Sequence, residues 1–266
     1  MGLFLNKGVE LQRQYRDPIP RTVHQTWKNG RIPEYLIKYV ESWKKVNIDF
    51  SQKLWTDEDA LLFVYHNYPK FIKKFESYSL GVMRSDAFRY LLMFHFGGIY
   101  SDLDYECYRS FSPLLRSRQL TLGWEWAGTP HALTGSGKPY SKGLLCEWHR
   151  YGNTIGNAVM ISPSRHPFWR FVIEALIDEH PGSMEHSKRS IWFLTGPEFL
   201  TKIFVENYHS SWDCRLLPHE CFYPISWHKP TLDDGFQKED FPLAYGAHHW
   251  AGTWWQPQPY ADLLTV

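Results

Sequence analysis

The amino-acid sequence predicts an α/β fold in which a single mixed, mainly parallel sheet is flanked by helices. Short strand patterns alternate along the chain with longer helical patterns, which is the order typical of this class. The 266 residues include 43% hydrophobic side chains, enough to bury one sizeable core. No internal repeat, low-complexity tract or long Pro/Gly/Ser linker interrupts the chain. We therefore expect one domain over residues 1–266, with residues 1–17 as an N-terminal extension.

The first elements carry clear boundary signals. The segment RTVHQTW at residues 21–27 predicts a strand, and a Lys-Asn-Gly turn follows it. Pro33 indicates the first turn of a helix, where proline is well tolerated. Residues 52–55 predict a second strand. Thr56, with Asp59 three residues later, has the spacing of a capping box that begins the next helix.

A nearly all-apolar helix is predicted from Ser79 to Phe96. Apolar side chains occur on all its faces, so we expect it to be buried. Gly97 and Gly98 end it, because glycine adopts the left-handed capping conformation at little cost. Residues 99–104 then predict a strand, which completes a strand–helix–strand unit.

The second half of the chain predicts shorter elements and one long loop. Residues 128–153 are rich in glycine and predict a surface loop, and loops of this length usually act as lids or binding loops. A short strand at 158–161 and helices at 168–177 and 196–207 follow. The tail at 242–255 is aromatic and histidine-rich, with no helical period.

Composition narrows the classes of function. The formal net charge is +1, so charge predicts no nucleic-acid partner and no anionic membrane surface. Aromatic side chains make up 17% of the chain, which suits either a large core or flat surfaces that stack on sugars or bases. No apolar stretch reaches the roughly 18 residues of a transmembrane segment, and no signal-peptide core is present. We expect a soluble, cytoplasmic protein; the Golgi lumen is the alternative if an N-terminal anchor has been removed.

Two aspartates, Asp102 and Asp104, follow the buried helix and its glycines. Residues i and i+2 of a strand share a face, which puts the two carboxylates about 6 Å apart. At an effective dielectric near 20 they repel each other by about 3 kcal/mol. A divalent cation that prefers oxygen ligands, Mn²⁺ or Mg²⁺, relieves this repulsion. The alternative is an Asp-x-Asp pair in a solvated turn.

A second charged pair lies inside the apolar helix. Asp86 and Arg89 are three residues apart and share one helical face. A buried charged pair is costly unless it is very well paired or binds something. Polyol hydroxyls suit this pair, because they accept hydrogen bonds from Arg and donate them to Asp; a simple helical ion pair is the alternative.

The stretch SDAFRYLLMFHFGGIYSDLD resembles the core of glycosyltransferase family 32, the sugar-binding region containing a DXD motif, which includes yeast-type mannosyltransferases, α-1,4-galactosyltransferases and the clostridial glucosylating toxins. Other blocks resemble the same family in the same order. They are IPRTVHQTW at 19–27, NAVM at 157–160, TGP at 195–197, FYP at 222–224 and HHWAGTW at 248–254. A DXD motif alone is weak evidence, but six ordered blocks over residues 18–255 are strong evidence.

This resemblance implies a GT-A-type nucleotide-binding fold over the whole chain. It also implies a retaining glycosyltransferase that moves a hexose from a UDP- or GDP-sugar to the hydroxyl of a glycan, lipid or polysaccharide. Mn²⁺ or Mg²⁺ would assist the reaction. The loop at 128–153 would close over the acceptor.

The resemblance also assigns roles to the matching residues. Asp102, Asp104, Asp86 and Arg89 are expected to be the catalytic residues. Asp102 would face the ribose and the metal, and Asp104 would be the more direct metal ligand. Asp86 and Arg89 would hold the hydroxyls of the donor sugar.

Further matching residues would bind the donor. Trp27 would stack on the nucleotide base, or be a core tryptophan at a strand end. Tyr100 would lie near the donor, or be a plain core tyrosine. Asn157 would lie close to the transferred sugar, or cap a turn at Gly156.

The C-terminal signature adds the remaining candidates. His248 or His249 would complete the metal shell; neighbours on an extended segment point opposite ways, so we favour His248. Thr253 and Trp254 would contact the donor, with the Thr253 hydroxyl reaching a phosphate. Two surface histidines are the alternative.

Retention of configuration needs either a covalent carboxylate intermediate or attack on the front face of the sugar. Glu125, between two tryptophans in LGWEWAG, is a candidate nucleophile, but an acceptor-binding or structural role is favoured, and so is front-face attack. A non-catalytic carbohydrate-binding module and a metal-dependent phosphodiesterase are the alternative functions. The sequence leaves the donor, the acceptor and the linkage open.

Overall fold

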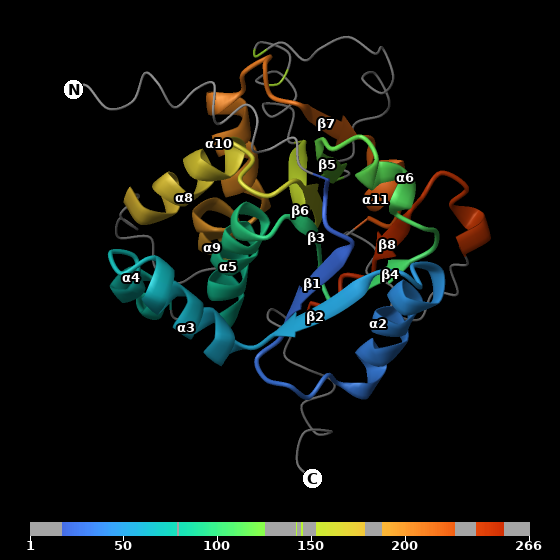
Figure 1. The fold of residues 1–266 in the computed structure, drawn as a ribbon, viewed down its shortest axis with the longest axis horizontal. Helices are drawn as coiled ribbons and strands as arrows, with labels where there is room; N and C mark the ends of the chain where they lie inside the picture. The colour runs from blue at the N-terminus through green and yellow to red at the C-terminus, as the bar shows by residue number, and fades with distance from the viewer. Residues whose placement is uncertain are drawn as a thin grey trace.

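The structure is a computed structural model, and it describes residues 18–78, 80–125, 142, 145, 153–178, 188–226 and 238–252. Figure 1 shows a central sheet with helices on both sides. The sheet has six strands in the order β2-β1-β3-β6-β5-β7. In chain order these strands are β1 (Thr22–Thr26), β2 (Ser51–Trp55), β3 (Gly98–Ser101), β5 (Leu120–Glu125), β6 (Thr154–Ser162) and β7 (Cys214–Leu217).

The direction of the strands indicates at which edge of the sheet a binding site is expected. Strand β1 is parallel to β2 and β3, and β5 is parallel to β7. Strand β6 runs antiparallel to both of its neighbours, β3 and β5. All strands except β6 therefore point the same way, so their carboxyl ends meet at one edge. This edge is where open α/β sheets bind ligands.

Helices cover both faces of this sheet. The helical segments are α2 (Glu34–Val46), α3 (Asp57–Asn67), α4 (Ile72–Ser77), α5 (Gly81–His95), α6 (Ser112–Leu115), α8 (Phe168–Asp178), α9 (Lys188–Leu194), α10 (Pro197–Asn207), α11 (His219–Phe222) and the 3₁₀ turn η1 (Lys238–Asp240). Helix α5 packs against β3, β6 and α8. Alternating side chains separate two cores: Tyr100 joins the core around α5, whereas Ile99 packs with Trp43 of α2.

The predicted α/β class with a mixed, mainly parallel sheet is confirmed, and a small antiparallel ribbon accompanies it. This ribbon pairs β4 (Tyr105–Cys107) with β8 (Gly246–His248). The predicted helix at 79–96 is present as α5, and Gly97 and Gly98 after it have φ angles of 64° and 87°. The capping box of Thr56 and Asp59 is also confirmed.

The prediction of one strand over residues 99–104 was wrong at its end. Strand β3 stops at Ser101, and Asp102 to Asp104 form a turn in which the Tyr105 N–H donates to the Asp102 carbonyl at 3.2 Å. The chain leaves the large sheet here because Tyr105 begins the ribbon with β8. Leu103 of the turn is buried against α2. The two aspartates therefore share a turn rather than a strand face.

One alternative from the sequence analysis is excluded, and one expectation falls mostly on residues that the structure does not describe. Gly156 lies within β6, which is longer than predicted, so Asn157 has no turn at Gly156 to cap. The loop predicted at 128–153 lies outside the described residues apart from Lys142, Leu145 and Asn153.

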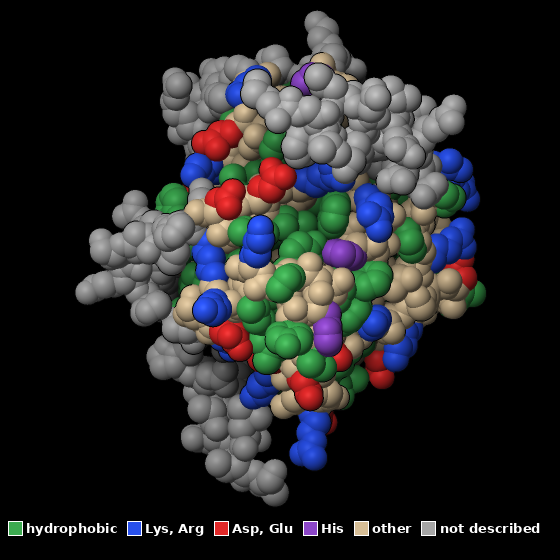
Figure 2. All heavy atoms as spheres, turned by 60° about the vertical axis from the view of Figure 1, so that its left-hand side comes forward, with side chains coloured by type: hydrophobic (Ala, Val, Ile, Leu, Met, Phe, Trp, Pro, Cys, Tyr) green, Lys and Arg blue, Asp and Glu red, His purple; other side chains and the backbone are tan. Residues whose placement is uncertain are grey.

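Figure 2 shows the face that carries α3 and α4, where hydrophobic side chains lie among both basic and acidic ones. Leu61, Leu62 and Tyr65 of α3 are among the exposed hydrophobic side chains. Within the described part of the chain, none of the helices combines the length and apolarity needed to cross a membrane.

Candidate active site

Three polar or aromatic side chains mark the carboxyl edge of the sheet. Trp27 follows β1, Asp102 follows β3, and Glu125 is the last residue of β5. Because these three strands are parallel, their ends bring the three residues to the same side of the molecule. Residues nearly 100 positions apart in the chain thus share one edge.

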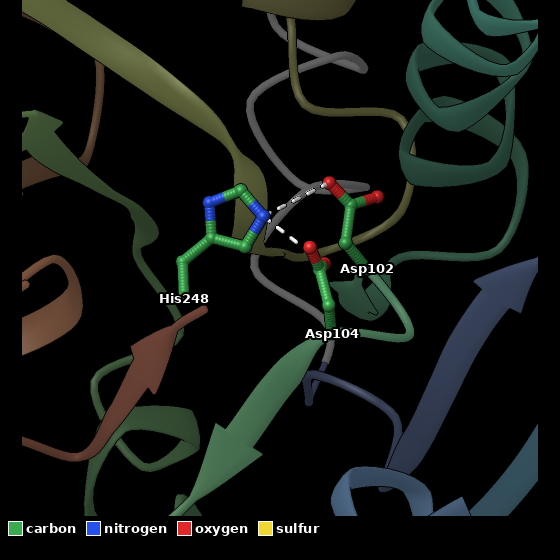
Figure 3. Close-up of side chains that lie close together, drawn as sticks. All are labelled: Asp102, Asp104 and His248. Carbon is green, nitrogen blue, oxygen red and sulfur yellow. Dashed lines mark hydrogen bonds and ion pairs between the residues drawn. The ribbon is translucent and has the colours of Figure 1, made fainter. Parts of the chain in front are cut away.

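An acidic cluster with one histidine lies at this edge (Figure 3). Asp102, Asp104 and His248 each offer one ligand atom, and these atoms all lie within 4.8 Å of one another. His248 Nε2 lies 3.0 Å from Asp104 Oδ1 and 4.0 Å from Asp102 Oδ2. The ribbon explains the meeting, because β4 follows the aspartate turn directly and pairs with β8, which ends at His248.

The two carboxylates are oriented by further partners. The Tyr100 hydroxyl donates to Asp102 Oδ1 at 2.8 Å, and Arg89 Nη1 lies 3.3 Å from the same carboxylate. The Ala251 N–H donates to Asp104 Oδ2 at 2.8 Å. Outer partners of this kind fix the direction of ligand atoms in metal sites.

The pKa values of the three cluster residues are shifted in different directions. Burial raises the pKa of Asp102, with Arg89 opposing this and Asp104 adding to it. For Asp104, burial is outweighed by His248 and the hydrogen bonds, so its pKa is lowered. Burial works against the charged form of His248, but Asp104 raises its pKa overall. The cluster therefore concentrates negative charge that is only partly neutralised.

These residues fit a divalent cation. Two carboxylates and one imidazole form a donor set that suits ions such as Mn²⁺ and Mg²⁺ better than a thiolate-preferring metal. The ligand atoms are close enough to converge on one ion. Among the described residues, this is the one group of three or more such side chains that could hold a metal.

The structure does not bring His249 to this cluster. His249 Nε2 lies 2.8 Å from Glu106 Oε2, and its ring stacks on Tyr39 with centroids 4.4 Å apart. The physical reason is the expected one: adjacent residues at the end of a strand point to opposite faces. Of the two candidate histidines, only His248 faces the aspartates.

Asp86 and Arg89 form a buried network beside the cluster. Both are 4% exposed, and Arg89 Nη2 lies 3.2 Å from Asp86 Oδ1. Asn157 Nδ2 donates to Asp86 Oδ1 at 3.0 Å, and the Asn157 carbonyl accepts from Arg89 Nη1 at 2.9 Å. The Thr195 hydroxyl donates to Asp86 Oδ2 at 3.1 Å. Asn157 thus joins the predicted pair.

Burial dominates the protonation of this network. It raises the pKa of Asp86 to about 7, against the opposing effect of Arg89. Arg89 keeps a raised pKa, because Asp102, Tyr100 and Asp86 outweigh the effect of its own burial. Arg89 contacts the carboxylates of Asp86 and Asp102, so it links the buried network to the acidic cluster.

Thr195 was not predicted as a site residue. It was noted only within the TGP block that precedes α10, where a threonine before a helix indicates a boundary rather than a contact. Its hydroxyl reaches Asp86 across 109 positions of sequence, and no local signal predicts such a contact.

The aromatic candidates occupy different environments. Tyr100 is fully buried, with the Arg89 guanidinium 4.6 Å from its ring centre and its hydroxyl 2.9 Å from Thr26 Oγ1. Trp27 is partly buried and packs against the cluster formed by Leu36, Tyr39 and Leu103. Thr253 and Trp254 lie outside the described residues.

Glu125 is also buried at this edge, with 8% of its surface exposed. The Thr154 hydroxyl donates to its Oε2 at 3.3 Å. Burial raises its pKa to about 7, and the charges of His248, Asp102 and Asp86 all act on it.

Comparisons with known proteins agree with the motifs. Residues 33–121 match the family described as "Glycosyltransferase sugar-binding region containing DXD motif". The chain is 28% identical over 249 residues to "Inositol phosphoceramide mannosyltransferase 3" of Schizosaccharomyces pombe, a match that covers 88% of this chain and 60% of that protein. It is 31% identical over 196 residues to "Mannosyl phosphorylinositol ceramide synthase CSH1" of Saccharomyces cerevisiae, covering 71% and 43%.

A solved structure has a similar fold. It is titled "PaToxG Glycosyltransferase", with a TM-score of 0.50, 13% sequence identity, and coverage of 75% of this chain and 76% of that one. At this identity the likeness concerns the fold alone. The present chain spans 60% and 43% of the lengths of the two yeast proteins above, so their matches concern part of each.

Proposed function

Because the chain belongs to the DXD-containing glycosyltransferases, we propose that it transfers a hexose from a nucleotide sugar to an acceptor hydroxyl. One observation carries this proposal. The cluster of Asp102, Asp104 and His248 directly adjoins the buried network of Asp86 and Arg89, and Arg89 touches both. A diphosphate and the sugar attached to it need this pairing of a cation site with a hydroxyl-binding site.

The first half of the site would hold a divalent cation, with Mn²⁺ as our first choice and Mg²⁺ as the second. Asp102, Asp104 and His248 would be its ligands. Such an ion supplies Lewis-acid stabilisation of the charge on a departing diphosphate. The Tyr100 hydroxyl and the Ala251 N–H, which donate to the two carboxylates, would hold them in position as ligands.

The second half of the site would hold the donor. Trp27, at the end of β1, would stack on the base, and Asp86 and Arg89 would exchange part of their present hydrogen bonds for bonds to sugar hydroxyls. Asn157, already bound to both, would keep the pair in place. Thr253 and Trp254 complete the proposed donor contacts.

We propose a GT-A-type site and transfer with retention by attack on the front face of the sugar. The bond between the anomeric carbon and the diphosphate oxygen breaks, and its electron pair goes to the diphosphate. The acceptor oxygen bonds to the anomeric carbon, and the acceptor proton passes to the departing phosphate. The segment at 128–153 would exclude water from this step, within a single catalytic domain over residues 1–266.

The names of the relatives suggest the order in which donors are tested. The two yeast proteins are named for mannose transfer to inositol phosphoceramide or for the synthesis of its mannosylated form. We therefore propose mannose as the transferred sugar and a glycolipid or glycan as the acceptor.

The test is nucleotide release from a panel of GDP- and UDP-sugars, with Mn²⁺ and with a chelator. We expect metal-dependent release from one donor, GDP-mannose first, and loss of at least 1,000-fold in the Asp102→Asn/Asp104→Asn double variant, because the leaving group loses its main stabilisation. Glu174→Gln, an exposed charge change on α8, is the matched control and should release nucleotide like the wild type.

The rival functions predict different results. A carbohydrate-binding module would gain thermal stability from free sugars and ignore Mn²⁺ with a nucleoside diphosphate. A phosphodiesterase would cleave a model phosphodiester such as bis-p-nitrophenyl phosphate. Either result, with no nucleotide release from any donor, would refute the transferase.

A further inference from the structure

Glu125 lies at the same edge of the sheet as Asp102. Asp102 comes one residue after β3 and Glu125 is the last residue of the parallel strand β5, with only β6 between them. Along β6, Asp102 is level with Ala158 and Glu125 with Thr154, so Glu125 lies two strands across the sheet and four residues further along it. Glu125 pairs in register with Thr154, at the beginning of the same strand that carries Asn157.

The carboxylate of Glu125 is poorly compensated. Its side chain is buried, and its one hydrogen bond among the described residues is the 3.3 Å contact from Thr154. No Lys or Arg in the described part of the chain forms an ion pair with it, and Arg89 pairs instead with Asp86 and Asp102. A buried carboxylate with so few direct partners is costly, so stability does not account for it.

The charged groups around Glu125 come from both halves of the site. Those that act on its carboxylate are His248 from β8, Asp102 from the turn after β3 and Asp86 from α5. Tyr223, which follows α11, is in turn affected by the charge of Glu125. Glu125 therefore lies within electrostatic reach of the proposed cation site and of the proposed sugar site at once.

That location is informative about the reaction. The anomeric carbon of a bound donor joins the diphosphate, at the cation site, to the sugar ring, at Asp86 and Arg89. It must therefore lie between these two groups of residues. As the bond to the diphosphate breaks, positive charge develops on this carbon, and a nearby carboxylate in its ionised form lowers the barrier.

We propose that Glu125 is a further catalytic residue, whose carboxylate faces the anomeric carbon and stabilises the positive charge that develops there. This role rests on the proposed glycosyltransferase function and adds a residue to it. It forms no bond to the sugar: the electron pair still leaves with the diphosphate, and the acceptor oxygen still forms the new bond. Thr154 is the positioning residue that orients the carboxylate.

The test uses the full chain, Mn²⁺ and the nucleotide sugar that the wild type cleaves, with water as the acceptor. Glu125→Gln keeps the shape and removes the charge. We expect kcat to fall about 100-fold, the range seen when one such electrostatic group is removed. The KM for the donor and the Kd for the nucleoside diphosphate should stay within twofold, since the interaction exists only in the transition state.

Two further variants separate this role from a structural one. Glu125→Asp keeps the charge and should lose about tenfold less kcat than Glu125→Gln; it also replaces the Gln variant if that protein does not fold. Glu174→Gln removes an exposed carboxylate from α8 and should change neither constant. Melting temperatures of all variants report any loss of folding.

Three outcomes would overturn the inference. An unchanged kcat in Glu125→Gln would make the residue structural. A rise in donor KM that accounts for the whole loss would make it a donor-binding residue. A covalent glycosyl–Glu125 adduct, found by mass spectrometry, would make it a nucleophile. If the wild type releases no nucleotide with any donor, the proposed function itself fails. This result is distinct from the three outcomes above, all of which need an active wild type.

Discussion

Two neighbouring histidines end the β4–β8 ribbon, and each is paired with a carboxylate of the facing segment. His248 lies 3.0 Å from Asp104, and His249 lies 2.8 Å from Glu106. As isolated pairs the two are almost the same chemically. Their surroundings, however, make one a candidate metal site and the other a packing contact.

The two histidine–carboxylate pairs differ in the side chain that lies next to each of them. The turn after β3 adds Asp102 to the His248 pair, whereas the His249 ring is stacked on Tyr39 of α2. Glu106 keeps 37% of its side chain exposed, against 14% for Asp104. A carboxylate–histidine pair thus becomes a candidate cation site where the fold supplies a second carboxylate.

The largest expected effect comes from replacing each histidine in turn. His248→Ala should weaken Mn²⁺ binding at least 30-fold, because one of three protein ligands is lost. His249→Ala should change it less than threefold, since its ring faces away. Titration calorimetry, or the electron paramagnetic resonance signal of free Mn²⁺, measures both affinities. Equal losses in the two variants would contradict the comparison.

A second prediction concerns the packing on the His248 side. A Cβ at Gly156 would lie 2.3 Å from Cζ of Tyr223, and the Tyr223 ring is edge-on to His248 with centroids 6.4 Å apart. Gly156→Ala should therefore lower the free energy of unfolding by about 1–3 kcal/mol through overpacking. It should also weaken Mn²⁺ binding, because Tyr223 must move.

Gly30→Ala is the matched control for this substitution. A Cβ at Gly30 has no atom within 4 Å, so neither stability nor metal binding should change beyond a few tenths of a kcal/mol. Urea unfolding followed by tryptophan fluorescence measures both variants. A Gly156→Ala protein as stable as the control would show that Tyr223 is not held against β6.

The smallest effect is expected on the His249 side. Glu106→Gln should cost less than about 1 kcal/mol of unfolding free energy, because partly exposed ion pairs contribute little. Nucleotide release and Mn²⁺ affinity should remain at wild-type values. A loss of metal binding comparable to that of Asp104→Asn would mean that both pairs belong to the site.

Much of the fold could be predicted because its signals are local. The apolar helix α5, the glycines after it and the capping box before α3 each depend on residues within a few positions. The end of β3 could not be predicted, because it depends on the pairing of β4 with β8, more than 130 residues later in the chain. The antiparallel direction of β6 is likewise set by partners distant in sequence.

The residues of the candidate site likewise divide into those predicted from local spacing and those brought together by packing. Asp86, Arg89, Asp102 and Asp104 occur within one short segment, and their spacing predicted two charged pairs. The contact of Thr195 with Asp86 and the link that Arg89 makes between the two pairs follow from packing. Glu125 was visible in the sequence, but its relation to both halves of the site depends on the order of three strands.

The sequence by itself determined the class of fold, the acidic pair and the buried helix that carries the second pair, since each follows from side-chain period or spacing. Only the tertiary structure decided which histidine joins the aspartates and which carboxylate lies near both halves of the site. The physical reason is distance along the chain. Short-range spacing controls direction and burial, whereas strand order and the facing of a ribbon bring charges together across more than 100 residues.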